Sequence, residues 1–279
     1  MPFRIRVPGE QSRSFANTSR QRDGNPRLIL DWNPSGSGAI ATGAYAGTET
    51  TIDGQQVFVY GKTSGDSAET TSTLELTATG LHVVHVGGSG DTTALRLVLT
   101  DNTLFPNMDK DLGSVCVTAS FSVASFNNAN SSINLLLEQE PRGDEPNTDH
   151  QQHDVWIQAF RQSASDWRVR SARSTGTAGD DQSFQDYGAD TLSGSEPSNI
   201  RLTLHGSNGS YFAGGDATAG PGTFQGVGLG TNQLRMIRTR AASMVAGAVS
   251  YPIVAIMFGR GESTAVDVTL TNLSVWTHG

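Results

Sequence analysis

From residue 28 onward, short runs of alternating apolar and polar residues are separated by clusters of Gly, Asn, Asp and Ser. Between Val115 and Val123 every second residue is apolar, and the positions in between hold Cys, Thr and Ser. Ile200, Leu202 and Leu204 alternate in the same way with polar residues. Because successive side chains of a strand point to opposite faces, this pattern predicts strands with one buried face.

Further runs of this kind lie at 56–60, 73–78, 81–86, 94–99, 133–138, 155–160, 167–171, 253–258 and 266–276. About a dozen short strands at this spacing, with turn residues between them, are typical of an all-β antiparallel sandwich or jelly roll. Residues 172–199 are predicted as a long loop. Residues 230–248 are open to two interpretations, a helix with Leu234, Ile237, Ala241 and Met244 on one face, or a loop.

Composition narrows the class of protein. The chain has 279 residues, of which 36% are hydrophobic and 16% charged, against about 25% charged in an average domain. The hydrophobic fraction excludes disorder of the whole chain, and the many Ser, Thr, Gly and Asn residues argue against a mainly helical protein. A single cysteine, Cys116, excludes an intrachain disulfide and a Cys-based zinc site.

Charge is divided unevenly along the chain. Residues 1–27 hold six arginines against two acidic residues, a net charge of +4, so the remaining residues carry −12 of the total of −8. This segment has three prolines and no helical periodicity, which favours an extended arm. Such an arm is either a solvated tail or a segment bound by another subunit; we expect the second, with contacts through Arg4, Arg6, Arg13, Arg20, Arg22 and Arg27.

The C-terminal two-thirds resembles a known family in the order of its strands. The stretches that carry the likeness are 115–160, IRLTLHGSNGSYFAGGD (200–216) and YPIVAIMFGRGESTAVDVTLTNLSVW (251–276). They are similar to three successive antiparallel strands, a polar hairpin and the closing strand pair of concanavalin A-like (legume lectin/glucanase) jelly rolls. The resemblance implies a jelly-roll domain at 112–279, preceded at 28–111 by extra strands of the same sandwich or a small second β domain.

Glucanases of that family use a cluster of three carboxylates on one strand, and the nearest counterpart here is Glu138-Gln139-Glu140 followed by Pro141. The third carboxylate is missing, and proline interrupts the strand where the site should continue. The histidines of DHQQHD (149–154) lack the helical spacing that would bring them together as metal ligands. We therefore expect no enzyme activity, no metal site and no cofactor.

One predicted strand carries a candidate glycan-binding surface, because sugar sites combine an aromatic ring with polar side chains. On residues 153–161, alternation places Asp154, Trp156, Gln158 and Phe160 on one face. Trp167 and Tyr187 lie nearby in the sequence. The competing interpretation is that these aromatic residues belong to the core.

Together these observations favour a structural protein of a virus particle, because a basic arm on an acidic β-sandwich suits docking on other virion subunits. The general make-up also resembles bacteriophage capsid decoration (cement) proteins and head or tail fibre proteins. We expect a homo-oligomer, with a trimer among the candidates, assembled in the host cytoplasm because MPFRIRVPGE (1–10) lacks the apolar core of a signal peptide. No apolar run is long enough for a membrane span, and the acidic body disfavours direct nucleic-acid binding. The alternatives are a lectin-like module for host attachment and, third, a glycan hydrolase.

Overall fold

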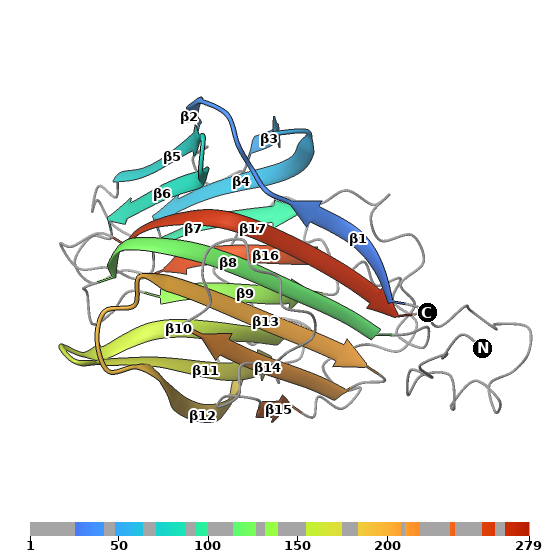
Figure 1. Cartoon of the computed structure of the whole chain (residues 1–279), viewed down its shortest axis with the longest axis vertical. Helices are drawn as coiled ribbons and strands as arrows, with labels where there is room; N and C mark the ends of the chain where they lie inside the picture. Colours follow the sequence, from blue (N-terminus) through green and yellow to red (C-terminus); the bar gives the residue numbers. More distant parts are fainter. Residues whose placement is uncertain are drawn as a thin grey trace, which may run out of the picture.

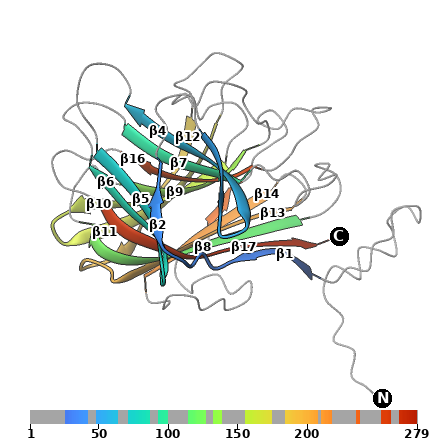
Figure 2. The same ribbon diagram turned by 90° about the horizontal axis from the view of Figure 1, so that it is seen from above.

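The protein is described here from a computed structural model. The structure describes residues 26–41, 48–63, 71–86, 93–99, 114–126, 132–138, 155–174, 184–207, 210–217, 235–237, 253–259 and 266–278. Its regular elements are strands in two antiparallel sheets, which Figure 2 shows as two facing layers. Within these residues, no helix is long and apolar enough to cross a membrane. The antiparallel β-sandwich predicted from the sequence is confirmed.

The nine-stranded sheet, here called sheet A, is nearest the viewer in Figure 1. Its strands pair in the order β15-β14-β13-β8-β17-β6-β5-β2, and β1 pairs with the second half of β17. They span β1 (Pro26–Trp32), β2 (Gly38–Ile40), β5 (Thr71–Thr77), β6 (Gly80–Val86), β8 (Ser114–Phe126), β13 (Asn199–Ser207), β14 (Ser210–Asp216), β15 (Arg235–Ile237) and β17 (Val266–His278).

The eight-stranded sheet, here called sheet B, lies behind sheet A in Figure 1 and pairs in the order β12-β11-β10-β9-β16-β7-β4-β3. Its strands span β3 (Thr48–Ile52), β4 (Gln55–Thr63), β7 (Thr93–Leu99), β9 (Ser132–Glu138), β10 (Val155–Ser163), β11 (Asp166–Ser174), β12 (Phe184–Ser193) and β16 (Ile253–Gly259). Strands before residue 112 extend both sheets: β1, β2, β5 and β6 belong to sheet A, and β3, β4 and β7 to sheet B.

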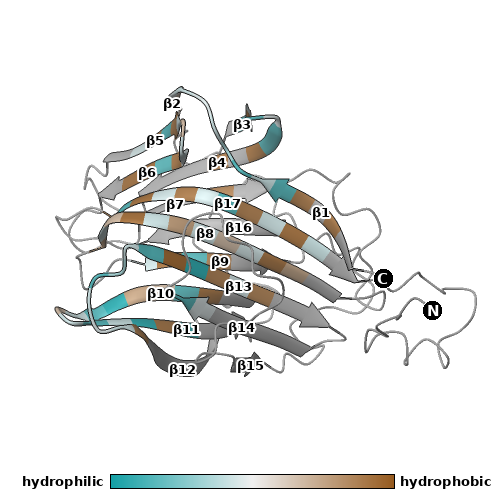
Figure 3. Cartoon of the chain, viewed as in Figure 1, coloured by the Kyte–Doolittle hydropathy of each residue, from teal (hydrophilic) through white to brown (hydrophobic). Residues whose placement is uncertain are grey.

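The core lies between the sheets and follows from the alternation in the sequence. Figure 3 shows hydrophobic and polar bands alternating along β1, β8 and β17. The inward residues of β8, among them Val117, Ala119 and Phe121, are fully buried, as are Ile133 and Leu135 of β9 in the facing sheet. Burial of this apolar surface is the main force that holds the two sheets together.

Three expectations about local structure are corrected. The three successive strands expected within 115–160 are divided between the sheets. β8 pairs with β13 and β17 in sheet A, whereas β9 and β10 pair with each other in sheet B. The predicted loop 172–199 contains the ten-residue strand β12. In the ambiguous segment 230–248, the described residues Arg235–Ile237 form a strand paired with β14, because pairing with a neighbouring strand outweighs weak helical spacing.

Two other predicted features lie in the described residues. The hairpin at 200–216 is confirmed as β13 and β14, which pair in register from Arg201↔Asp216 to Ser207↔Ser210. The two strands expected to close the domain, β16 and β17, form in opposite sheets. β16 lies between β9 and β7 in sheet B. β17 of sheet A pairs with β8 along one edge and with β6 and β1 along the other. Residues 1–25 of the predicted arm lie outside the described residues.

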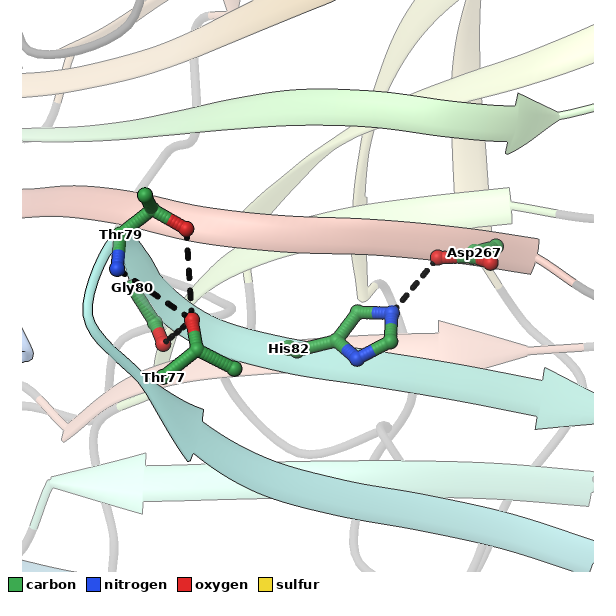
Figure 4. Close-up of polar contacts among 5 residues, drawn as sticks. All are labelled: Thr77, Thr79, Gly80, His82 and Asp267. Atoms are coloured by element: carbon green, nitrogen blue, oxygen red, sulfur yellow. Dashed lines mark hydrogen bonds and ion pairs between the residues drawn. The ribbon is translucent and has the colours of Figure 1, made fainter. Parts of the chain in front are cut away.

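The turn between β5 and β6 is closed by hydrogen bonds of the Thr77 hydroxyl, as Figure 4 shows. The Thr77 hydroxyl donates a hydrogen bond to the Gly80 carbonyl oxygen at 2.8 Å and accepts one from the Thr79 backbone N–H at 3.4 Å. Gly80 has a φ of +148°, and a Cβ at this position would lie 2.4 Å from the Leu270 carbonyl oxygen. Glycine is therefore required here both by backbone conformation and by the close approach of β17.

Candidate functional site

The outer face of sheet B carries the candidate site, and β10 supplies its first residues. Ile157 and Ala159 point into the core and are buried. Gln158 and Phe160 occupy the alternate positions and are half-buried on the outer face. Gln158 and Phe160 therefore share the face of β10 that points away from the core.

The neighbouring strand β11 adds two arginines that the sequence analysis did not assign to the site. The register aligns Arg170 with Gln158 and Arg168 with Phe160. The Arg170 Nε donates a hydrogen bond to the Gln158 Oε1, and its guanidinium lies over the Phe160 ring, 5.1 Å from the ring centroid. Alternation in Trp167–Arg170 was a usable signal, since Val169 is apolar and both neighbours are arginines.

Gln158, Phe160, Arg168 and Arg170 are called the β10–β11 patch below. Asp166 contacts this patch, accepting a hydrogen bond from the Arg168 Nε at 2.8 Å. The contacts of Arg170 include the Gln158 amide and the Phe160 ring. The patch therefore combines an aromatic face, planar hydrogen-bonding groups and two cations.

Beside the patch, β9 presents buried polar residues on the side away from the core. Ser132 and Asn134 alternate with the fully buried Ile133 and Leu135, and are 7% and 1% exposed. The Asn134 Nδ2 donates a hydrogen bond to the Ser132 Oγ at 3.1 Å. The register places Asn134 opposite Gln158 and Ser132 opposite Phe160. The outer face of sheet B is thus accessible over β10 and β11 and covered over β9.

Trp167, predicted near the glycan-binding surface, belongs to the core instead. Its side chain is 2% exposed, and its Nε1 donates a hydrogen bond to the Phe126 carbonyl oxygen at 2.9 Å. The Phe126 backbone N–H donates in turn to a carboxylate oxygen of Glu196, which lies between β12 and β13. Trp167 lies on the face of β11 opposite Arg168, so it is inaccessible as a stacking plate for a sugar.

The other predicted site residues fall largely outside what is described. Trp156 and Tyr187 lie in β10 and β12, where the structure describes their backbone but not their side chains. Asp154 lies outside the described residues. The same is true of Arg4, Arg6, Arg13, Arg20 and Arg22, whereas the backbone of Arg27 is in β1 and pairs with Thr277.

The alternative hydrolytic pair is also only partly described. Glu138 ends β9, where its backbone pairs with Ile253 of β16, and Glu140 lies beyond the described residues. The described part of the chain contains no group of three or more His, Cys, Asp or Glu residues placed to hold a metal ion.

The outer face of sheet A has a different character, because its polar groups bind one another across strands. Arg201 of β13, whose side chain is 7% exposed, forms an ion pair with Asp216 of β14 at 3.2 Å. The Asn272 Nδ2 donates to the Asp31 Oδ1 at 2.7 Å and to the Asn33 Oδ1 at 3.0 Å. These contacts join β13 to β14 and β17 to the end of β1.

Two further groups lie on this face. His82 of β6 and Asp267 of β17 pair at 2.8 Å, as Figure 4 shows. Cys116 of β8 is 4% exposed, and burial raises the pKa of its thiol to about 11, against a smaller lowering by a hydrogen bond with Thr118. A thiol with this pKa is protonated at neutral pH and is therefore unreactive in the folded protein.

No family model matches the chain, and no curated protein matches it in sequence. Solved structures are similar to it at low identity. A carbohydrate recognition domain, that of Emp46p, is 13% identical, covering 74% of this chain and 87% of that one with a TM-score of 0.49. An alginate lyase from Pseudomonas aeruginosa is 11% identical, covering 74% and 86% with a TM-score of 0.45. The CBM2 module of the evolved Dit of Lactobacillus casei BL23 phage J-1 is 10% identical, covering 91% and 97% with a TM-score of 0.42. These likenesses concern architecture and say nothing of what this chain binds.

Proposed function

We propose that the chain is a non-enzymatic, concanavalin A-like carbohydrate-binding module that holds its ligand on the β10–β11 patch. The observation that carries this proposal is the arrangement of Arg170, which contacts both Gln158 and Phe160. Sugars are recognised by an aromatic surface for their C–H faces and by planar polar groups for their hydroxyls. The patch offers both kinds of group on two adjacent, regularly paired strands.

The contacts within the patch favour binding because they order its side chains before a ligand arrives. The guanidinium of Arg170 is oriented by the amide oxygen of Gln158 on one side and the ring of Phe160 on the other. A preordered side chain loses less conformational entropy on binding, so more of the interaction energy contributes to affinity.

A non-enzymatic role agrees with the carboxylates of the patch. Retaining glycoside hydrolysis needs two carboxyl groups about 5–5.5 Å apart. Asp166, the carboxylate whose contact with the patch is described, is bound to Arg168 and so is not placed as a free nucleophile or acid. Turnover of any bound glycan that is abolished by Glu138→Gln would contradict this part of the proposal.

A glycan array with the full chain tests the binding proposal. We expect binding to at least one glycan class, and Phe160→Ala to weaken it about tenfold by removing the stacking ring. The matched control is Leu28→Ala, which removes an apolar side chain that is 45% exposed on β1 of the other sheet. Loss of binding in both variants, or in neither, would argue against the patch.

A second role, as a virion structural protein, is proposed on the distribution of arginine. Seventeen of the 19 basic residues are arginine, and six lie in residues 1–27. Arginine binds carboxylates through two parallel hydrogen bonds and is weakly hydrated, which suits a permanent contact with acidic capsid or tail subunits. In this role the arm holds the module on the particle and the β10–β11 patch faces the host.

Deleting residues 2–25 tests the arm, because β1 begins at Pro26 and stays intact. The truncated chain should fold and bind glycan as before. It should fail to join particles when expressed with the other structural proteins of its virus. Replacing Arg4, Arg6, Arg13, Arg20 and Arg22 by Lys is the control that keeps the charge and removes the planar fork. Unchanged incorporation of the truncated chain into particles overturns the docking role. Light scattering of the full and truncated chains measures the oligomeric state of each.

A further inference from the structure

We infer that the β10–β11 patch binds a neutral polysaccharide whose internal units carry two free vicinal hydroxyls, and that Arg168 is the residue that selects them. In this inference Asp166 is the positioning residue that orients Arg168. The inference rests on the proposed carbohydrate-binding function and adds the chemical class of the glycan. It depends on the contact between Asp166 and Arg168 of β11, whose side chains the structure describes.

Asp166 and Arg168 lie on the same outward face of β11. They are two residues apart, and Trp167 and Val169, which alternate with them, are buried in the core. The Arg168 Nε donates a hydrogen bond to the Asp166 Oδ2 at 2.8 Å, and the Arg168 side chain is 32% exposed. Asp166 therefore fixes the direction of the guanidinium, while about a third of the arginine side chain stays accessible.

The guanidinium of Arg168 has donors to offer a ligand. Its hydrogen bond to Asp166 uses one of its five N–H groups. The four N–H groups of Nη1 and Nη2 form no hydrogen bond in the part of the chain that the structure describes. A guanidinium holds these donors in one plane, so it favours two acceptor oxygens that lie side by side. A carboxylate and a pair of vicinal sugar hydroxyls both meet this condition.

The contact with Asp166 favours the hydroxyl pair over a carboxylate. The charge of Arg168 is paired with Asp166 at 2.8 Å. A ligand carboxylate bound by Arg168 would lie close to the Asp166 carboxylate, and like charges repel at such short range. The net charge of the chain, −8, adds to the repulsion of an anionic polymer. A neutral hydroxyl pair accepts the same hydrogen bonds without this repulsion.

The surroundings of Arg168 suit a sugar ring within a longer chain. The register aligns Arg168 with Phe160 of β10, whose half-buried ring provides an apolar surface beside the guanidinium. The end of the β10–β11 hairpin, residues 162–165, is exposed and consists of Gln, Ser, Ala and Ser. A polysaccharide bound on the patch can extend past this end of the hairpin, so internal units have access to Arg168.

The first test compares neutral oligosaccharides by calorimetry with the full chain. Cellohexaose, mannohexaose and galactohexaose are 1,4-linked and carry free 2- and 3-hydroxyls on every internal unit. Laminarihexaose is 1,3-linked and has vicinal hydroxyls only at its ends. We expect at least one 1,4-linked hexaose to bind about fivefold or more tighter than laminarihexaose. Arg168→Lys keeps the charge but removes the planar group, and should weaken that binding about tenfold.

The matched control for Arg168→Lys is Arg161→Lys on the same hairpin. Arg161 is registered with the buried Trp167, and its guanidinium lies over that ring, 5.4 Å from the ring centroid. It therefore belongs to the face of β10 opposite Phe160. Arg161→Lys should bind the hexaoses as the parent does. Equal losses in both variants would mean that the substitutions act through the hairpin as a whole, which overturns the role of Arg168.

Substitutions of Asp166 test its positioning role. Asp166→Asn removes the counter-charge of Arg168, so it should weaken hexaose binding about threefold and also produce binding to polygalacturonate, an acidic polymer. Asp166→Glu keeps a carboxylate and should bind the hexaose within about twofold of the parent. Weaker hexaose binding by Asp166→Asn, without any binding to polygalacturonate, would mean that Asp166 only supports the fold and would overturn the positioning role.

The outcomes separate the inference from the proposed function. The inference is overturned by equal binding to laminarihexaose and the 1,4-linked hexaoses, by unchanged binding in Arg168→Lys, or by tighter binding of the parent to polygalacturonate. Binding on the array to other glycans alone also overturns it, and the carbohydrate-binding function then stands if Phe160→Ala weakens that binding. Absence of binding to every hexaose and to every glycan on the array overturns both.

Discussion

The outer faces of the two sheets use polar residues in opposite ways. On sheet A, Arg201 pairs with Asp216, and Asn272 with Asp31 and Asn33, so each group is satisfied by a neighbouring strand. On sheet B, the half-buried side chains of Gln158, Phe160 and Arg170 contact one another across β10 and β11. Buried polar groups that bind one another across strands stabilise a fold, whereas half-buried aromatic and polar side chains on an outer face are accessible to a ligand. Substitutions on sheet A should therefore lower stability, and those on sheet B should lower binding.

The largest loss of stability is expected from Arg201→Ala on sheet A. The substitution removes the ion pair with the Asp216 carboxylate, whose side chain is 22% exposed. Breaking a buried pair by removing one partner lowers the free energy of unfolding by about 3 kcal/mol. Urea unfolding followed by circular dichroism measures the change, with Arg168→Ala of the half-buried pair on sheet B as the matched control. A loss of similar size in both variants would remove the contrast between the sheets.

The second effect concerns pH and Cys116, also on sheet A. Burial raises the pKa of its thiol from 9.0 to about 11, so the folded state holds the proton more tightly than the unfolded chain. The resulting stabilisation is complete below pH 9.0 and is lost as the pH rises through 11, by about 1.4 kcal/mol per pH unit. Unfolding free energies of the parent and of Cys116→Ala, which has no thiol, should differ by an amount that changes over this window. A difference that stays constant between pH 8 and 11 would show that the thiol is not shielded.

A smaller loss, about 1–2 kcal/mol, is expected from Asn272→Ala. This side chain is 5% exposed and joins β17 to the end of β1 through two hydrogen bonds. Asp31 and Asn33 are exposed and regain water, so the loss is less than for Arg201. Thermal unfolding measures it, and Asn199→Ala, a half-buried Asn at the start of β13, serves as the control. An unchanged melting temperature for Asn272→Ala would mean that these contacts contribute nothing to sheet A.

The sandwich was predictable because alternation in stretches such as 115–123 reports directly which face is buried. Sheet membership was not, because alternation does not indicate which strand lies alongside another, and β8 and β9, successive in the sequence, belong to opposite sheets. The candidate site was half predictable, because alternation along β10 alone places Gln158 and Phe160 on the same face. Trp167 was assigned to the wrong face and Arg170 was overlooked because the faces of β11 residues depend on how β11 pairs with β10. That pairing contains a bulge between Arg161 and Ser163.

The smallest effect on stability is expected from Arg170→Gln on sheet B. Glutamine keeps a polar side chain on the outer face, and the lost contacts with Gln158 and Phe160 are partly exposed, so the free energy of unfolding should fall by no more than about 0.5–1 kcal/mol. The same variant is expected to weaken binding to a glycan that the array identifies about tenfold, which corresponds to about 1.4 kcal/mol. Urea unfolding and calorimetry on one preparation give both values, with Arg201→Ala showing the reverse order of effects. If Arg170→Gln lowers stability as much as Arg201→Ala does, Arg170 is a structural residue and the two outer faces do not differ in role.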